Sequence, residues 1–134
     1  MHKYLKESIE IMAPASKVWE YFTNPKLSRA LGGEYISEWK VGSEISWMSV
    51  EGEIYTKGKI LEIEPSCFLK HTLVDMESPD QVLLINTYTF EEFDEITLLT
   101  GKAEFKKPIE DKEYEDAVAG WKDIFGAIKE IVEL

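Results

Sequence analysis

Four polar side chains that could recognise a ligand or move a proton lie in segments whose residues otherwise alternate like half-buried strands. They are His71 in segment 67–75, Asn86 and Tyr88 in segment 81–91, and Thr100 in segment 95–106. A histidine titrates near neutral pH, so His71 could act as a general base or as a hydrogen-bond donor to a ligand. Asn86 and Tyr88 could orient a ligand carbonyl. Each also has a structural alternative: His71 could bond to a neighbouring strand, and Asn86 and Tyr88 could satisfy each other.

The alternation of side chains along a strand decides whether these four residues share one face of a sheet. The expected inward-facing sets are Leu69, His71 and Leu73; Asn86, Tyr88 and Phe90; and Ile96, Leu98 and Thr100. If these sets face a covering helix, a few polar groups lie in an otherwise apolar hollow, which is a common composition for a ligand site. In segment 81–91 the opposite face is apolar as well, through Leu83 and Ile85, and a one-residue shift of register would invert the assignment.

Four aromatic residues extend the candidate cavity beyond these strands. Trp39 and Trp47 lie in strand-like segments near its expected mouth, where exposed aromatic rings favour binding. Trp121 and Phe125 lie in the C-terminal segment, where Trp121 could pack in the core, line the cavity, or do both. The complete candidate set is Trp39, Trp47, Leu69, His71, Asn86, Tyr88, Thr100, Trp121 and Phe125.

The element that must cover these strands is a single long helix over residues 112–134. Its apolar residues recur at spacings of three and four, which places them in one stripe along the helix. At about 1.5 Å per residue the helix would be roughly 34 Å long, the width of a small domain. The stripe consists of Tyr114, Ala117, Val118, Trp121, Ile124, Phe125, Ile128, Ile131 and Val132.

The rest of the chain reads as strands with one helical interruption. Residues 3–12 alternate as a half-buried strand, and a helix follows over about 15–23 with Pro14 as its first residue. Asn24 can cap a short second helix in which Pro25 takes the first position. Six further strands are expected at 34–39, 43–50, 53–64, 67–75, 81–91 and 95–106. Because the connections are short, neighbouring strands are antiparallel.

This order of elements predicts one α+β domain over residues 1–134. It would be a helix-grip fold, in which a seven-stranded antiparallel curved sheet wraps around the long C-terminal helix. Two short helices would lie between strands 1 and 2. A container of this shape leaves room for a ligand between sheet and helix.

Composition excludes several classes of partner. The net charge of −11 leaves no basic surface for nucleic acid or for an anionic membrane. No apolar run approaches the roughly 18–20 residues that span a bilayer, so membrane insertion is not expected. The single cysteine, Cys67, and the lack of an apolar secretory segment near the N-terminus indicate a reducing, cytoplasmic location. The acidic run 91–95 suits a hairpin tip better than a docking surface for a basic partner.

Catalytic and cofactor motifs are sparse. His2 is the only histidine besides His71, so a histidine-based metal site is not expected. The chain has no glycine-rich phosphate loop and no nucleophile elbow, and nothing in its motifs calls for a cofactor. Cys67 has no basic cluster nearby that would lower the pKa of its thiol.

Three segments resemble a known family. Residues 11–19, with the sequence IMAPASKVW, resemble the opening strand-to-helix signature of the SRPBCC (START-like, helix-grip) superfamily. Residues 58–65, GKILEIEP, and residues 119–121, AGW, are similar to the central strand and the final helix of one of its branches, the activator of heat-shock-protein-90 ATPase homologues. The resemblance covers nearly the whole chain and implies a helix-grip domain that binds a small molecule. It supplies no catalytic signature that could be transferred.

Three functions remain open at this stage. The first is non-catalytic binding or transport of a small hydrophobic or amphipathic molecule, by a monomer or by a homodimer formed through Leu83 and Ile85. The second is a cyclase- or hydratase-like enzyme in which His71 or Tyr88 handles protons. The third is a protein-interaction module, such as a chaperone partner. The container shape and the missing catalytic signature favour the first.

Overall fold

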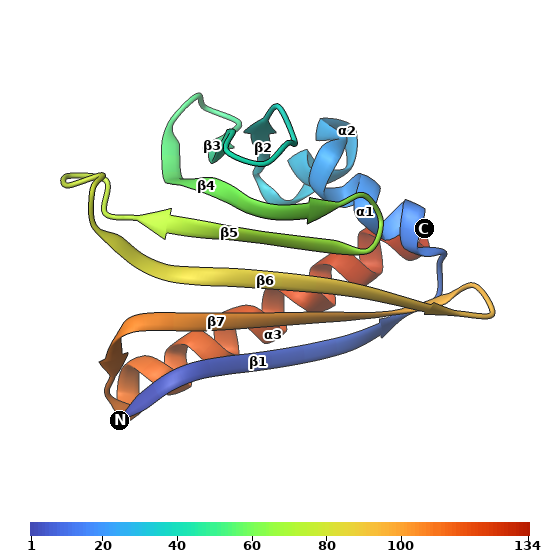
Figure 1. Ribbon diagram of the computed structural model, residues 1–134. Coiled ribbons are helices and arrows are strands. Elements are labelled where there is room, and N and C mark those ends of the chain that lie inside the picture. Colours follow the sequence, from blue (N-terminus) through green and yellow to red (C-terminus); the bar gives the residue numbers. More distant parts are fainter.

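The computed structural model describes residues 1–134 as a curved antiparallel sheet that holds one long helix (Figure 1). The seven strands follow the order β1-β7-β6-β5-β4-β3-β2. Their bounds are β1 His2–Ile11, β2 Gly33–Ser37, β3 Glu44–Ser49, β4 Ile54–Glu64, β5 Phe68–Val74, β6 Val82–Phe93 and β7 Ile96–Ile109. The helices are α1 Ala15–Thr23, α2 Pro25–Ser28, a 3-10 turn η1 Arg29–Leu31 and α3 Asp111–Glu133. The predicted helix-grip fold is confirmed.

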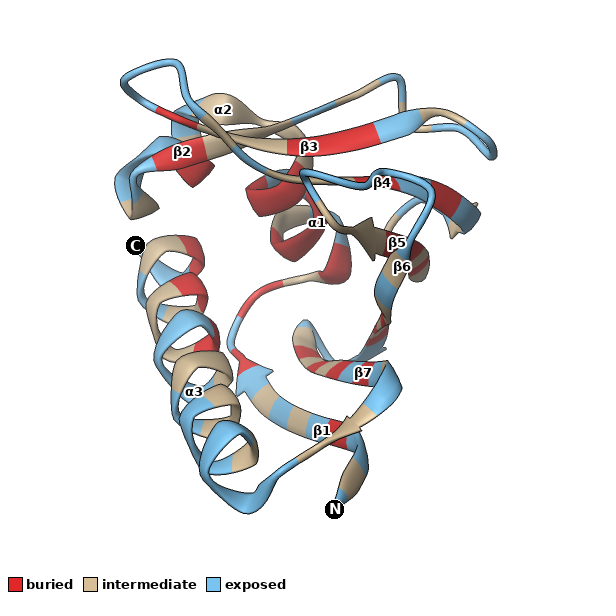
Figure 2. Ribbon diagram, turned by 90° about the vertical axis from the view of Figure 1, so that its left-hand side faces the viewer, coloured by how far each residue is buried: buried red, intermediate tan, exposed pale blue.

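Helix α3 lies against the inner side of the sheet, and its buried residues face inward (Figure 2). Phe125, Ile128 and Val132 are almost fully buried on this side. They join a core to which α1 contributes Val18 and Phe22. The remainder of α3 is largely exposed, as its amphipathic sequence pattern requires.

Helix α1 begins where the chain leaves β1, and its start is held by the hairpin of β6 and β7. Pro14 occupies the N-cap position, one residue before the position expected from the sequence, and its side chain can cap no backbone N–H group. Glu92 of β6 supplies the missing acceptor, because a carboxylate oxygen accepts from the Ala15 N–H at 2.7 Å. The Thr97 hydroxyl donates to the Ala13 carbonyl at 2.7 Å. Part of the acidic run 91–95 therefore has a structural role. Asn24 caps α2 as predicted, by accepting from the Lys26 N–H.

The hairpin between β6 and β7 corrects one prediction about which residues face the helix. Asp94 and Glu95 both adopt left-handed conformations and form the two-residue tip. The tip fixes the register, which places Leu99 opposite Phe90 and Gly101 opposite Tyr88. Directly opposed residues point to the same face of a sheet.

The inward face of β7 therefore carries Leu99 and Gly101, and the predicted set of Ile96, Leu98 and Thr100 was wrong by one residue. Leu99 is fully buried, whereas Leu98 is half-buried on the outer face. Two adjacent leucines made the alternation ambiguous, and the tip geometry that resolves it is not visible in the hydrophobic pattern.

Gly101 makes the close approach of α3 possible. A Cβ atom at this position would lie 2.2 Å from the Trp121 ring and 2.7 Å from the Phe125 ring. Real side chains do not tolerate such distances, so any larger residue would push the helix away from the sheet. Glycine at this point of β7 lets the indole pack directly on the backbone of the strand.

We expect the substitution Gly101→Ala to lower the free energy of unfolding by about 1–3 kcal/mol, because the added methyl group overpacks the contact with Trp121. Urea denaturation followed by far-ultraviolet circular dichroism measures the change. The matched control is Gly126→Ala in α3, where a Cβ atom would meet nothing within 4 Å. This control should raise the free energy of unfolding by about 0.4–1 kcal/mol. Equal effects at the two positions would contradict the packing argument.

Candidate functional site

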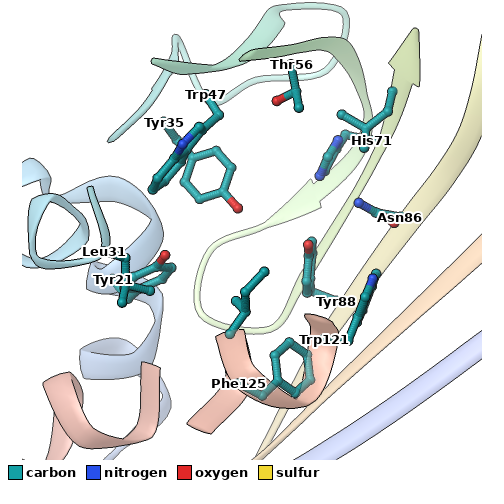
Figure 3. Close-up of a pocket in the computed structure, with 12 residues that line it drawn as sticks. Tyr21, Leu31, Tyr35, Trp47, Thr56, His71, Asn86, Tyr88, Trp121 and Phe125 are labelled. Atoms are coloured by element: carbon teal, nitrogen blue, oxygen red, sulfur yellow. The ribbon is translucent and has the colours of Figure 1, made fainter. Parts of the chain in front are cut away.

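A cavity of about 370 Å³ lies between the inner face of the sheet, α3 and the segment that carries α1 and η1 (Figure 3). Its lining is mostly aromatic and aliphatic, with a few polar groups. The twelve lining residues are Tyr21, Leu31, Tyr35, Trp47, Thr56, His71, Leu73, Asn86, Tyr88, Trp121, Ile124 and Phe125. None of these side chains carries a charge at neutral pH unless His71 is protonated.

Most of the residues predicted from the sequence meet in this cavity. The structure places six of them in its lining: Trp47, His71, Asn86, Tyr88, Trp121 and Phe125. They come from β3, β5, β6 and α3, so segments far apart in the chain converge on one hollow. His71 and Asn86 lie directly opposite each other on β5 and β6.

The other three predicted residues lie elsewhere. Leu69 is fully buried in the core. Trp39 lies beyond the end of β2 in a left-handed conformation, and its ring packs against Trp19 with a centroid distance of 6.1 Å. Thr100 points to the outer face, where its hydroxyl lies 3.1 Å from the Ser8 hydroxyl. The Thr100 placement follows from the register correction in β7.

Several lining residues were missed by the sequence analysis. The most informative are Tyr21 on α1 and Tyr35 on β2, which bring two more phenol groups to the cavity. Tyr35 lies opposite Trp47 in the hairpin of β2 and β3, with ring centroids 4.9 Å apart. A sequence signal for Tyr35 did exist. Pairing the expected strands 34–39 and 43–50 as a hairpin could have placed Tyr35 beside Trp47. Leu31, Thr56 and Ile124 were also omitted, and Leu73, which was expected to face inward with His71 but was not a candidate, lines the cavity as well.

The hydrogen bonding of His71 fixes its tautomer. Its Nδ1 atom lies 3.0 Å from the Thr72 carbonyl oxygen, which can only accept, so Nδ1 carries the proton. In the neutral ring the Nε2 atom is then an acceptor. Nε2 is buried and has no hydrogen-bond partner. Burial lowers the pKa of His71 below its ordinary value of 6.5, which the bond to Thr72 only partly offsets.

Asn86 presents the second polar group without a full set of partners. Its Oδ1 atom is buried and unbonded, and the amide group projects beside the His71 ring (Figure 3). Buried polar atoms are normally paired, so two unpaired ones in neighbouring strands mark this wall of the cavity as unusual.

Three tyrosines surround the same space as neutral phenols. Burial raises the pKa of Tyr35 to about 12, although its interaction with the Tyr88 hydroxyl lowers it somewhat. Burial also raises the pKa of Tyr21 and of Tyr88 well above the ordinary value. The Tyr88 ring lies nearly parallel to the His71 and Trp121 rings, with centroid distances of 6.0 Å to each. The cavity therefore offers hydrogen-bonding groups and aromatic surface without charge.

Neither a cluster of metal-ligating side chains nor a membrane-spanning helix is found in the structure. No group of three or more His, Cys, Asp or Glu side chains is placed to hold a metal ion. Among the helices, none has the length and apolar character needed to cross a bilayer.

The fold and the cavity define a helix-grip protein, in which a curved antiparallel sheet holds a long C-terminal helix over an apolar hollow. The family model described as "Activator of Hsp90 ATPase homolog 1-like protein" matches residues 12–133. The chain belongs to this family, which confirms the resemblance found in its sequence.

Several solved structures share the fold at low sequence identity. Protein MLL2253 from Mesorhizobium loti is 20% identical, with a TM-score of 0.79 over 97% of this chain and 96% of that chain. DynU16, a protein in the dynemicin biosynthetic locus, is 19% identical, with a TM-score of 0.81 over 99% of this chain and 48% of that chain. The Aha1 dimer from Colwellia psychrerythraea is 14% identical, with a TM-score of 0.78 over 98% of this chain and 96% of that chain. At these identities the likeness concerns the fold alone. No curated protein matches the chain.

The neutral state of His71 predicts a pH dependence of stability. Because the pKa of His71 is lower in the folded protein than the ordinary 6.5, the unfolded chain binds a proton first as the pH falls. The contribution of the neutral ring to stability is complete above about pH 6.5 and is lost below it, by at most about 1.4 kcal/mol per pH unit.

Urea denaturation of the wild type and of His71→Phe between pH 7.5 and pH 5 measures this term as the difference between the two proteins. His2 is present in both proteins and cancels. The free energy of unfolding of the wild type should fall more steeply below pH 6.5 than that of the variant. A steeper fall in the variant would contradict the assignment of a buried, neutral His71.

Proposed function

We propose that this protein binds a small hydrophobic or amphipathic molecule in the cavity between the sheet and α3, as a carrier or binding protein and not as a catalyst. The observation that carries the proposal is the combination of an apolar, aromatic hollow with two buried polar atoms that lack partners. A few convergent polar groups on an apolar surface are the usual composition of a small-molecule site.

The size of the cavity supports a small ligand. Its volume of about 370 Å³ lies at the lower end of the range of roughly 300–1,000 Å³ that ligand sites occupy. Ile124 of α3 lines the cavity and is about half exposed, so the lining reaches the surface of the molecule at this helix. Proteins of this fold family commonly bind hydrophobic ligands, which agrees with the proposal.

A second candidate, an enzyme of the cyclase or hydratase type, is favoured by one observation. The unprotonated Nε2 atom of His71 is buried in the cavity wall, near the Tyr88 phenol, and could accept a proton from a bound substrate. The raised pKa of Tyr88 makes this phenol a poor proton donor, which weakens the catalytic alternative. The carrier function requires only the contacts that the cavity already offers.

A protein-interaction function would use a different surface. Phe93 at the hairpin tip is 71% exposed beside acidic residues and is the most prominent apolar side chain there. A protein partner bound at Phe93 would not contact the cavity and would not explain its two unpaired polar atoms. The structure therefore supports ligand binding better than a protein-interaction function.

Binding of the neutral fluorescent probe N-phenyl-1-naphthylamine tests the proposal. We expect saturable enhancement of probe fluorescence with a stoichiometry of one. The substitution Thr56→Phe places a ring in the cavity lining and should weaken binding by about tenfold or more, because the ring occupies the ligand volume.

The matched control is Thr87→Phe, a strand threonine on β6 whose two neighbours, Asn86 and Tyr88, are the inward-facing residues. Thr87 therefore faces outward, and this variant should bind the probe like the wild type. Loss of binding in the control but not in Thr56→Phe would place the probe outside the cavity. Absence of saturable binding to the wild type would contradict the proposed function.

A further inference from the structure

The cavity wall formed by β5 and β6 contains buried polar atoms that have no hydrogen-bond partner. His71 is 3% exposed and Asn86 is 6% exposed, so bulk water reaches neither side chain freely. Nε2 of His71 and Oδ1 of Asn86 have no partner. Leaving a buried polar atom unpaired is costly, and the large majority of buried polar atoms in native proteins have a hydrogen-bond partner.

The tautomer of His71 determines whether the missing partner must be a hydrogen-bond donor or an acceptor. The Nδ1–H group of His71 donates its hydrogen bond to the Thr72 carbonyl oxygen, so only the lone pair of Nε2 remains available to the cavity. A lone pair is satisfied by a donor, which means an O–H or N–H group. A ligand that offers only carbonyl or ether oxygens would leave Nε2 unpaired.

The charge of the ligand is constrained by the same lining. No lysine, arginine or carboxylate side chain lines the cavity, and the whole chain carries a net charge of −11. A buried carboxylate or phosphate would meet no counter-charge and would be repelled by the surroundings. An ammonium group would likewise find no carboxylate, and only aromatic faces could offset its loss of hydration.

The shape of the hollow adds a third constraint. Rings of Tyr88 and Trp121 form one nearly parallel pair, and the Tyr35 and Trp47 rings form another, edge-to-face pair. Such walls offer extended contact to a flat, ring-containing molecule.

We infer that the ligand is an uncharged, ring-containing molecule that donates a phenol or alcohol O–H to Nε2 of His71, with the Asn86 amide as a second polar contact. This inference rests on the proposed function and names the chemical class of its ligand. His71 is then a specificity-determining residue, which selects donors over ethers and neutral molecules over ions.

Four probes of similar size test these three constraints on the ligand separately. They share a biphenyl frame and differ in one group: 4-phenylphenol, 4-methoxybiphenyl, biphenyl-4-carboxylate and 4-phenylbenzylamine. Isothermal titration calorimetry at pH 7.5 gives the dissociation constant of each for the wild-type protein. The phenol should bind about tenfold tighter than its methyl ether, the gain expected when a donor satisfies a buried acceptor. The carboxylate and the amine should bind more weakly than the ether.

The variant His71→Phe keeps a ring of similar size and removes the acceptor. The phenol should lose its preference over the ether, and the ether should bind at least as tightly as it does to the wild type. Retained ether binding shows that the variant is folded and that its cavity is intact. In ¹⁵N-labelled wild-type protein, the Nε2 resonance of His71 should shift on addition of the phenol and should not shift on addition of the ether. This second readout needs no variant.

The outcomes separate the inference from the proposed function. If the phenol and the ether bind equally and Nε2 does not shift, the donor requirement is overturned while ligand binding stands. If the carboxylate or the amine binds tightest, the requirement for an uncharged ligand is overturned. If neither these four probes nor N-phenyl-1-naphthylamine binds, the proposed function fails and the inference fails with it.

Discussion

The contact between the Trp121 indole and the backbone at Gly101 sets the distance between α3 and the sheet. An atom added at Gly101 would lie 2.2 Å from the indole, so no other residue allows the helix to come as close. Beyond this contact, toward the C-terminus, Ile128 and Val132 of α3 enter the core that Val18 of α1 also forms. Trp121 and Phe125 also line the cavity, so the packing that fastens the helix also builds one wall of the site.

On the opposite wall, formed by β5 and β6, one hydrogen bond determines which groups are available to the cavity. By donating to the Thr72 carbonyl, the His71 ring is held in a single tautomer with its free acceptor in the cavity wall. Burial keeps the ring neutral, and burial also keeps the surrounding phenols protonated. The result is a polar but uncharged site inside an acidic protein. The charged side chains of the chain lie outside the cavity lining, and under the proposed function the ligand would be recognised through hydrogen bonds and aromatic contact.

The sequence predicted the elements well where one periodic pattern dominated. The stripe along 112–134 placed α3 within one residue of its observed bounds, and the inward face of β6 followed from the alternation of Asn86, Tyr88 and Phe90. The prediction failed in β7, because Leu98 and Leu99 are both apolar and the two-residue tip at Asp94 and Glu95 decides between them.

The site was predictable to the extent that its residues lie on strongly patterned elements. Trp39 was expected in a strand, yet β2 ends at Ser37 and Trp39 turns into a left-handed conformation beside the core. Tyr21 and Tyr35 were missed because their entry into the cavity depends on how α1 and the β2–β3 hairpin fold over the sheet. Such tertiary placement leaves no periodic trace in the sequence. The acceptor role of Nε2 in His71 depends on the hydrogen bond between Nδ1 and the Thr72 carbonyl, which only the three-dimensional structure reveals.

The most direct test of the central claim is a two-dimensional ¹H–¹⁵N NMR titration of the labelled protein with N-phenyl-1-naphthylamine. The account predicts that the largest chemical-shift changes occur at the cavity, in particular at His71, Asn86 and the Trp121 indole N–H. The outward-facing residues Thr87 and Thr100 should change little. Changes concentrated on the outer face of the sheet, or at the groove that Leu83 and Lys107 line beside the start of α3, would contradict the assignment of this cavity as the ligand site.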